Sequence, residues 1–264
     1  MSKSVGITVS LQWVRQLGKK WIRIGPDFLE GIFAGQKNYT KYILLARPRT
    51  GSTLLNLMLR SHPNVCAWGE SFGRIGQQNE AHILANIFSQ YPERVRAVGF
   101  KIHYNHPGDR NATQIWKRLR QMDDLHVIHL KRKNLLRTIV SSQIAQKLRL
   151  TQISKASKRP TLLERSVLLT APDLRDRFMT TQKHEFNFSQ KFSEHSSLHV
   201  FYEDLVANPE QEFRRITDFL CLPFFLPEIR VKKMNPEKLS SLLPNYAALK
   251  ADFAGTSWES FFDD

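Results

Sequence analysis

Residues 42–55 read YILLARPRTGSTLL, a short apolar run followed by a basic turn and a stretch with helical spacing. The apolar run at 42–46 predicts a buried parallel strand, and residues 52–60 predict a helix. A turn between a strand and a helix presents free backbone N–H groups at the positive end of the helix dipole. This order of elements predicts an α/β fold with an anion-binding turn around Gly51.

The same alternation of apolar runs and helical periodicity continues along the chain. The expected strands are 97–102, 125–130 and 198–202, and the expected helices are 81–89, 113–122, 134–147, 174–192 and one starting at 209. Asn208 and Gln211 stand where a capping box would begin that last helix. Strands that alternate with helices favour a parallel sheet covered on both faces. We therefore expect an α/β three-layer sandwich with a central, mostly parallel sheet, a P-loop-like arrangement.

The N-terminal region differs from the rest. Residues 9–25 predict an amphipathic helix, with Trp13 and Trp21 on its apolar face and Lys19 and Lys20 among its basic residues. Such a helix either packs on the domain surface or makes peripheral contact with an anionic membrane. We expect residues 1–36 to form an N-terminal amphipathic segment and 37–264 a single domain. No stretch approaches the roughly 20 apolar residues that a bilayer span needs.

The charge of the chain indicates anionic partners. Lysine and arginine number 39 against 24 acidic residues, which gives a formal net charge of +15. Nucleic acid, an anionic membrane or a polyanionic small ligand would each suit that field. Zinc-ligand spacing and an RNA-recognition motif are absent from the sequence, so nucleic acid is not the expected partner. Cys66 and Cys221 lie among apolar neighbours and predict buried free thiols in a reducing, cytoplasmic location.

The turn after the first strand carries the chemistry of an oxyanion site. Gly51 lets the backbone approach a ligand closely, Thr50, Ser52 and Thr53 supply hydroxyl groups, and Arg49 supplies a cationic donor fork. The ATP-binding P-loop has a glycine five residues earlier and a lysine at the position of Ser52, and both are missing. A kinase-like enzyme is therefore disfavoured, although another nucleotide-dependent transferase remains an alternative.

A second basic turn follows the expected strand at 125–130. Residues 127–145 read VIHLKRKNLLRTIVSSQIA, so Lys133 stands at the carboxyl end of a strand, and Ser141 follows eight residues later on a helix. Open α/β sheets bind ligands at that edge. The turn predicts a second phosphate site, and the alternative is a basic surface turn with an ordinary helix serine.

Together the two turns resemble those of sulfotransferases that use 3′-phosphoadenosine 5′-phosphosulfate (PAPS), in particular the bacterial glycolipid and carbohydrate type. In that family a first loop, P-[KR]-[ST]-G-[ST]-[ST], binds the 5′-phosphosulfate, and PRTGST at 48–53 matches it. An arginine followed eight positions later by a serine binds the 3′-phosphate; here Lys133 has that spacing and Arg132 adjoins it, so their assignment stays open. The resemblance implies these nucleotide-binding residues: Arg49, Thr50, Gly51, Ser52, Thr53, Leu54, Arg132, Lys133 and Ser141.

A third match covers 201–223, which begins FYEDL and is similar to a late strand and helix of the family. We expect this segment to be structural. The R-K-G nucleotide contact near the C-terminus of the cytosolic enzymes is not visible in this sequence.

The resemblance implies an enzyme of the EC 2.8.2 class that moves the sulfuryl group of PAPS to an acceptor hydroxyl, with PAP as product and no metal. Arg49 would neutralise the leaving phosphate. Two candidates could be the general base: Glu70 in NVCAWGESFG, which would need a raised pKa, or His103 in GFKIHYNH, with Lys101 assisting the leaving group. A carbohydrate or glycolipid hydroxyl is the expected acceptor, phenols remain possible, and a basic nucleic-acid-binding protein is the non-enzyme alternative.

Overall fold

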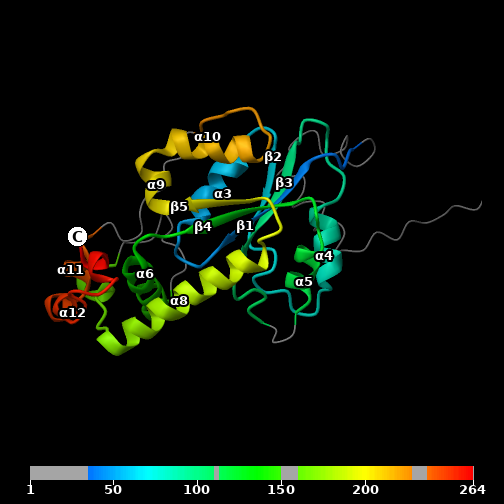
Figure 1. Cartoon of the computed structure of the whole chain (residues 1–264). Coiled ribbons are helices and arrows are strands. Elements are labelled where there is room, and N and C mark those ends of the chain that lie inside the picture. The colour runs from blue at the N-terminus through cyan, green and yellow to red at the C-terminus, as the bar shows by residue number, and fades with distance from the viewer. Residues whose placement is uncertain (1–34, 110–112, 150–159, 228–236, 264) are drawn as a thin grey trace, which may run out of the picture.

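A computed structural model describes residues 35–109, 113–149, 160–227 and 237–263. Five strands form one parallel sheet with the order β2-β3-β1-β4-β5 (Figure 1). The strands are β1 Thr40–Ala46, β2 Val65–Trp68, β3 Ala97–His103, β4 Leu125–Lys131 and β5 Ser197–Phe201. The predicted α/β sandwich is confirmed, because helices cover both faces of this sheet (Figure 1).

The helices divide between the two faces of the sheet. α3, α9 and α10 lie on one side, and α4, α5, α6 and α8 lie on the other (Figure 1). Their bounds are α3 Ser52–Ser61, α4 Glu80–Ile87, α5 Ile115–Arg120, α6 Leu135–Lys147, α7 Leu162–Arg165, α8 Ala171–Lys191, α9 Tyr202–Ala207, α10 Pro209–Phe219, α11 Leu239–Leu242, α12 Tyr246–Asp252 and the 3₁₀ turn η2 Glu259–Phe262.

The central strand β1 shows why its sequence is a continuous apolar run. Side chains alternate between the faces of a strand, and both faces here are covered. Ile43 and Leu45 belong to the core cluster that includes Phe188 of α8. Leu44 belongs to the opposite cluster, which includes Phe213 of α10. Both layers are closed around this strand, since all three of its side chains named here are fully buried.

The C-terminal tail, for which the sequence predicted no elements, forms a third core cluster with α6 and α8. Phe178 of α8 lies at its centre and makes ring contacts with Phe253, Trp258 and Phe261 at centroid distances of 5.6, 5.6 and 5.1 Å. Asn134, at the start of α6, donates its amide to the carbonyl of Phe261 at 3.0 Å. The tail therefore supports the helix that carries Ser141.

Two strands differ from the prediction. β2 was not predicted, because its four residues are too few to show an alternating pattern. The last strand, predicted to reach Tyr202, ends at Phe201, and α9 begins at Tyr202. The consequence is functional, because Tyr202 and its neighbours thereby reach the edge of the sheet that carries the basic turns.

The capping prediction at Asn208 was half right, because Asn208 is the N-cap residue of α10 but its side chain does not cap the helix. Asn208 makes no side-chain cap bond, and its backbone N–H donates to the carbonyl of Asp204 at 2.8 Å, so the residue also ends α9. Its φ and ψ of −132° and 64° belong to a tight junction between two helices. Gln211 therefore does not complete a capping box.

The prediction for the cysteines was half right. Cys66 is a buried free thiol, but Cys221 is exposed. Cys221 has a φ of 55° in the turn after α10, where the backbone N–H bonds to the carbonyl of Asp218. Apolar neighbours in sequence do not bury a side chain that a turn directs outward.

The expected N-terminal helix lies outside the described residues. Gln36, close to the expected domain boundary, forms an isolated bridge with Tyr91 and donates its amide to the carbonyl of Val95. Within the described ranges, no helix has both the length and the apolar character that crossing a membrane would require.

Candidate active site

The first basic turn ends in a helix N-terminus without a capping side chain. Gly51 is the N-cap of α3, with φ 89° and ψ 10°, a left-handed conformation that favours glycine. A Cβ atom at this position would overlap the ring of Tyr202. The first turn of α3 carries no acidic residue, and its first backbone bond runs from Leu55 to Gly51. The amides of this turn thus face the sheet edge in the arrangement that suits an anion.

The hydroxyl groups of this loop have different partners. Thr50 is buried and donates to the carbonyl of Arg47 at 2.7 Å, so its hydroxyl stabilises the loop from inside. Ser52 Oγ lies 3.4 Å from His103 Nε2, and Thr53 Oγ1 accepts from Lys101 Nζ at 3.3 Å. Ser52 and Thr53 therefore connect the loop to the end of β3.

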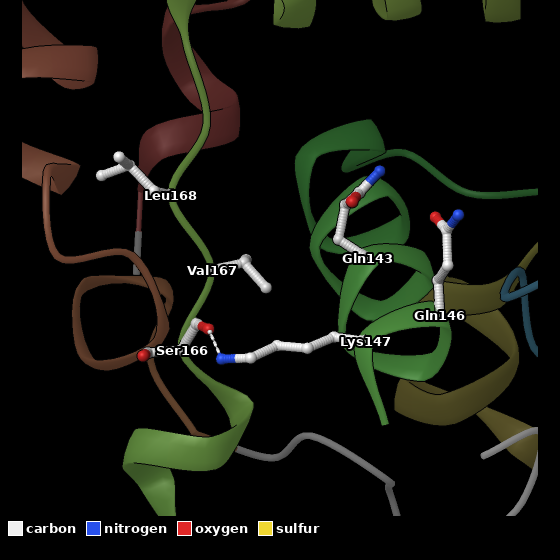
Figure 2. Close-up of a pocket in the computed structure, with 6 residues that line it drawn as sticks. All are labelled: Gln143, Gln146, Lys147, Ser166, Val167 and Leu168. Atoms are coloured by element: carbon white, nitrogen blue, oxygen red, sulfur yellow. Dashed lines mark hydrogen bonds between the residues drawn. The ribbon is translucent and has the colours of Figure 1, made fainter. Parts of the chain in front are cut away.

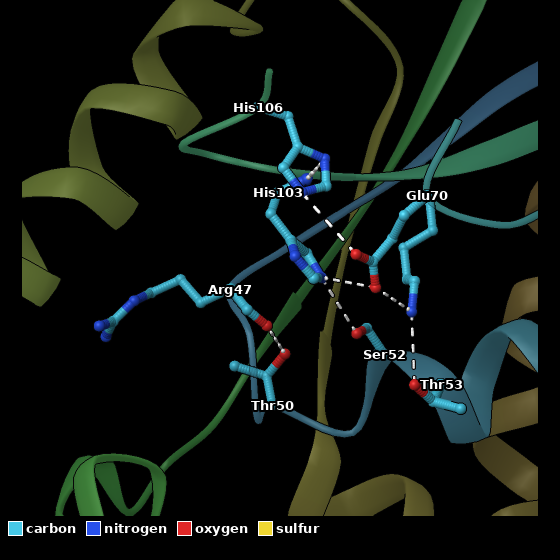
Figure 3. A network of polar contacts seen from close by, with 8 residues as sticks. Arg47, Thr50, Ser52, Thr53, Glu70, His103 and His106 are labelled. Carbon is cyan, nitrogen blue, oxygen red and sulfur yellow. Dashed lines mark hydrogen bonds and ion pairs between the residues drawn. The ribbon is translucent and has the colours of Figure 1, made fainter. Parts of the chain in front are cut away.

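Arg47, which also precedes the turn, points elsewhere. Its guanidinium extends away from the loop (Figure 3) and donates to the hydroxyl of Thr181 on α8. Of the two arginines that lead into the turn, only Arg49 is directed toward the second basic turn.

The two basic turns meet in space although they are far apart in sequence. Arg49 Nε donates to Ser141 Oγ at 3.0 Å across a separation of 92 residues. Arg132 Nη1 donates to the carbonyl oxygen of Arg49 at 3.2 Å. β1 and β4 are neighbouring parallel strands, so the turns that follow them share one edge of the sheet. Gly51 and Ser141 thus belong to one site.

Arg132 and Lys133, which the sequence left as alternatives, occupy different environments. The Arg132 side chain is 16% exposed and lies over the Tyr202 ring, 4.6 Å from its centroid. The Lys133 side chain is 54% exposed, and its ammonium pairs with Asp204 at 2.5 Å. Arg132 is therefore the one of the two that contacts the first loop.

Burial of cations gives the site its electrostatic preference. Burial lowers the pKa of Arg49, and the neighbouring Arg132 charge lowers it further. Burial also lowers the pKa of Arg132, a shift that the Glu203 carboxylate opposes. Both shifts mean that two buried positive charges lie close together at a cost in free energy. An anion bound between the turns would reduce that cost, so its binding would be favourable.

Glu70 and the end of β3 form a second polar group beside the first loop. Glu70 follows β2, and its Oε1 atom lies 2.8 Å from Lys101 Nζ and 4.0 Å from His103 Nε2. Its other oxygen lies 3.8 Å from His106 Nε2. Figure 3 shows the side chains of His103 and His106 beside the Glu70 carboxylate, with Ser52 and Thr53 on the adjoining side. The structure therefore brings both candidate bases into one cluster.

The pKa values of the two candidates make both of them proton acceptors at neutral pH. Burial alone would raise the pKa of Glu70, but the hydrogen bond and charge of Lys101, with contributions from His103 and His106, hold it below its usual value. This shift is the opposite of the raised pKa that a general base at this position would need. Burial lowers the pKa of His103 to about 4. Glu70 is thus ionised and His103 neutral at pH 7.

Glu70, His103 and His106 also offer three ligand atoms within 4.8 Å of one another, the residue types of a metal site. The backbone N–H of His103 donates to His106 Nδ1 at 3.2 Å, so neutral His106 carries its proton on Nε2, the atom that faces Glu70. A metal ion could bind this nitrogen only through a lone pair, and the proton on Nε2 occupies that position. The Lys101 ammonium beside Glu70 would also repel a metal cation. These contacts favour proton transfer over metal binding.

A separate pocket lies between α6 and the chain that follows α7 (Figure 2). Lys147 crosses it and donates to the carbonyl of Ser166 at 2.8 Å. None of the predicted site residues lines it; the lining consists of Gln143, Gln146, Lys147, Ser166, Val167 and Leu168.

Sequence reasoning did not assign a role to His106, Tyr202 or Glu203. His106 follows His103 by three residues, a spacing that could have indicated a second imidazole in the site. Tyr202 and Glu203 belong to the FYEDL motif, which was expected to be structural. Their position near the turns depends on the early end of β5, which the apolar pattern does not reveal.

Residues 110–225 match the model of a family described as the sulfotransferase family. The match includes the second turn and Ser141 but not the first loop or Glu70. Nodulation protein H of Rhizobium tropici is 25% identical over 84% of this chain and 92% of its own length, and that of Rhizobium meliloti (strain 1021) is 24% identical over 84% and 94%. The sulfotransferase domain from the curacin biosynthetic pathway aligns with a TM-score of 0.45 and 17% identity, over 85% of this chain and 89% of that domain.

Proposed function

We propose that this chain is a sulfotransferase that moves the sulfuryl group of PAPS to an acceptor hydroxyl, and that the two basic turns hold that nucleotide. The proposal assigns the 5′-phosphosulfate to residues 49–54 and the 3′-phosphate to Ser141 with Arg132 or Lys133. Adenosine 3′,5′-bisphosphate (PAP) would be the product.

One observation supports this assignment above the others: Arg49 Nε contacts Ser141 Oγ at 3.0 Å. Each turn alone could bind any oxyanion. Their contact joins the N-terminus of α3 to a hydroxyl on α6. A ligand with two separate phosphate groups would use both turns, whereas a single phosphate would use one.

PAPS, when bound, supplies a sulfuryl group on a phosphate that can leave. The loop and Lys101 of β3 would each have a task in the transfer. Arg49 and the amides of the first turn of α3 neutralise the charge that grows on the phosphate oxygen as its bond to sulfur breaks. Lys101, placed by its contacts with Thr53 and Glu70, provides a second cation on the side of the acceptor.

We assign the role of general base to Glu70. Its side chain is 42% exposed, whereas that of His103 is 7% exposed, so the carboxylate is the more accessible to an acceptor hydroxyl. The hydrogen bond and charge of Lys101 offset the cost of burial and keep the pKa of Glu70 low, so the carboxylate is ionised. It would take the acceptor's proton while the acceptor oxygen attacks sulfur. His103, neutral and 3.4 Å from Ser52, would orient the loop.

For the acceptor we propose a carbohydrate or glycolipid hydroxyl. The PRTGST loop together with a Gly-Glu after the first helix resembles the bacterial enzymes of that type. A contact of residues 1–36 with an anionic membrane would bring a lipid-linked acceptor close to the site, and that contact and a cytoplasmic location remain predictions.

Titration calorimetry with PAP tests the donor assignment. We expect saturable binding that is unchanged by EDTA, and a transfer of radiolabelled sulfate from PAPS to members of a panel of sugars, glycolipids and phenols. Folded protein that does not bind PAP would refute the nucleotide assignment. Transfer to phenols alone would refute the acceptor class and leave the donor assignment intact.

A further inference from the structure

Helix α9, Tyr202–Ala207, contacts both basic turns through its first two residues. Tyr202 lies against Gly51 so closely that a Cβ atom there would overlap its ring. On the side of the second turn, the Arg132 guanidinium lies over the same ring, 4.6 Å from its centroid. One aromatic side chain therefore packs against both turns beside their direct contact.

Glu203, the next residue, binds the backbone of the second turn. Its Oε2 atom accepts the N–H of Lys133 at 2.9 Å, and its Oε1 atom accepts the N–H of Asn134 at 3.3 Å. The Asn134 side chain in turn accepts the N–H of Arg137 and caps α6. The carboxylate thus occupies backbone donors at which an anion could otherwise bind.

The same carboxylate extends the connection to the first loop. Glu203 Oε1 accepts from Arg132 Nε at 3.4 Å, and Arg132 Nη1 donates to the carbonyl of Arg49 at 3.2 Å. The Glu203 side chain is 31% exposed and that of Arg132 is 16% exposed, so these contacts are partly shielded from water. The planar guanidinium uses two of its donors in fixed directions, which a lysine could not reproduce.

We propose that Glu203 is a positioning residue that holds the two basic turns at the separation of the 5′- and 3′-phosphates of one nucleotide. It acts through Arg132 on the first loop and through two backbone amides on the second. Because Glu203 occupies these backbone amides, only side chains of the second turn can bind the second phosphate. The site is thereby restricted to ligands whose two phosphate groups are separated by the correct distance. This inference rests on the proposed nucleotide-binding function.

The experiment compares ligands with two phosphates and with one. The dissociation constants of PAP, adenosine 5′-monophosphate and adenosine 3′-monophosphate are measured by calorimetry, with displacement titrations for weak ligands, on wild type and Glu203→Gln. We expect PAP to bind Glu203→Gln about 10-fold more weakly or worse, and its advantage over either monophosphate to shrink about fivefold. Glu210→Gln is the matched control, because Glu210 pairs with the exposed Arg214 on the surface of α10; it should leave all three affinities unchanged.

A merely structural role would weaken the three ligands equally or act through unfolding, so thermal unfolding is recorded for each protein. Equal losses for all three ligands, or an unchanged PAP affinity in folded Glu203→Gln, would overturn the inference. If Glu203→Gln does not fold, Arg132→Lys tests the same connection, because it keeps a cation for Glu203 but lacks the fork that reaches Arg49. We expect it to reduce the PAP advantage as well, and an undiminished advantage would also overturn the inference. Absence of PAP binding by wild type would instead refute the proposed function.

Discussion

The two basic turns occupy the same edge of the sheet but are built in opposite ways. The first turn leads into α3 with Gly51 at the N-cap and no capping side chain. The second leads into α6 with Asn134 as a side-chain cap and Glu203 on its backbone amides. The first can therefore bind an anion through its backbone, whereas the second must bind through side chains. Anion binding at the first turn therefore depends on the backbone conformation, and anion binding at the second turn depends on which side chains are present.

Gly51→Ala should have the largest effect, because it attacks the backbone shape of the first turn. A side chain at φ 89° is strained, and its Cβ would overlap Tyr202. We expect PAP binding to fall by about 1,000-fold or more and the free energy of unfolding to drop by about 2–4 kcal/mol. Calorimetry and thermal unfolding measure the two effects.

Gly76→Ala separates backbone strain from the overlap. Gly76 also has a positive φ, 54°, but nothing lies within 4 Å of a Cβ atom built there. We expect a loss of about 1 kcal/mol in stability and no change in PAP binding. If Gly51→Ala behaved in the same way, the first turn would not depend on its backbone as proposed.

Glu70→Gln should separate chemistry from binding at both turns. Glu70 contacts Lys101 and faces His103 without contacting the second turn. We expect kcat to fall by about 100-fold or more while the dissociation constant of PAP stays nearly constant. The Glu70 charge raises the pKa of His103, so the substitution would lower the pKa of His103. If activity is retained and the acid limb of the pH profile moves to lower pH, His103 is the base.

The pH dependence follows from the lowered pKa of Glu70. A base works only when deprotonated, so kcat/KM should stay level from neutral pH down through the ordinary range of a glutamate and decrease only below it. Lys101→Met removes the hydrogen bond and charge that lower this pKa, and burial then raises it. The acid limb of the kcat/KM profile should therefore move to higher pH. A limb that does not move would contradict the assigned role of Lys101.

Ser141→Ala should have a moderate effect confined to the second turn. The substitution removes the hydroxyl that accepts from Arg49 Nε at 3.0 Å. We expect a loss of about 1 kcal/mol, or about fivefold, in PAP affinity and no change for adenosine 5′-monophosphate. An equal loss for both nucleotides would mean that Ser141 supports the first loop instead of a second phosphate.

Lys133→Ala should have the smallest effect. Its side chain is 54% exposed and pairs with Asp204, and exposed ion pairs contribute little. We expect PAP affinity to change by less than about threefold, compared with about 10-fold or more for Arg132→Ala. The reverse order in calorimetry would assign the 3′-phosphate to Lys133 and leave Arg132 only a role in joining the turns.

The sequence predicted most residues of the proposed site but not the contacts between them. Residues 42–55 combine a buried strand, a glycine turn and a helix, and local physical chemistry explains all three. Glu70 and His103 were alternative candidates for the general base, because the sequence places them on separate segments. β2 and β3 are adjacent strands, so the structure places the two side chains together. The role of Glu203 was hidden because its partners lie 69 to 71 residues away.

By itself the sequence determined the class of fold, both basic turns and the residue types that an oxyanion site requires, because apolar periodicity, glycine and charge act over a few residues. Only the tertiary structure decided that Arg49 meets Ser141, that Arg132 rather than Lys133 faces the first loop, and that the pKa of Glu70 is lowered instead of raised. These properties depend on strand order and burial. Strand order and burial arise from contacts between distant segments, which no local pattern specifies.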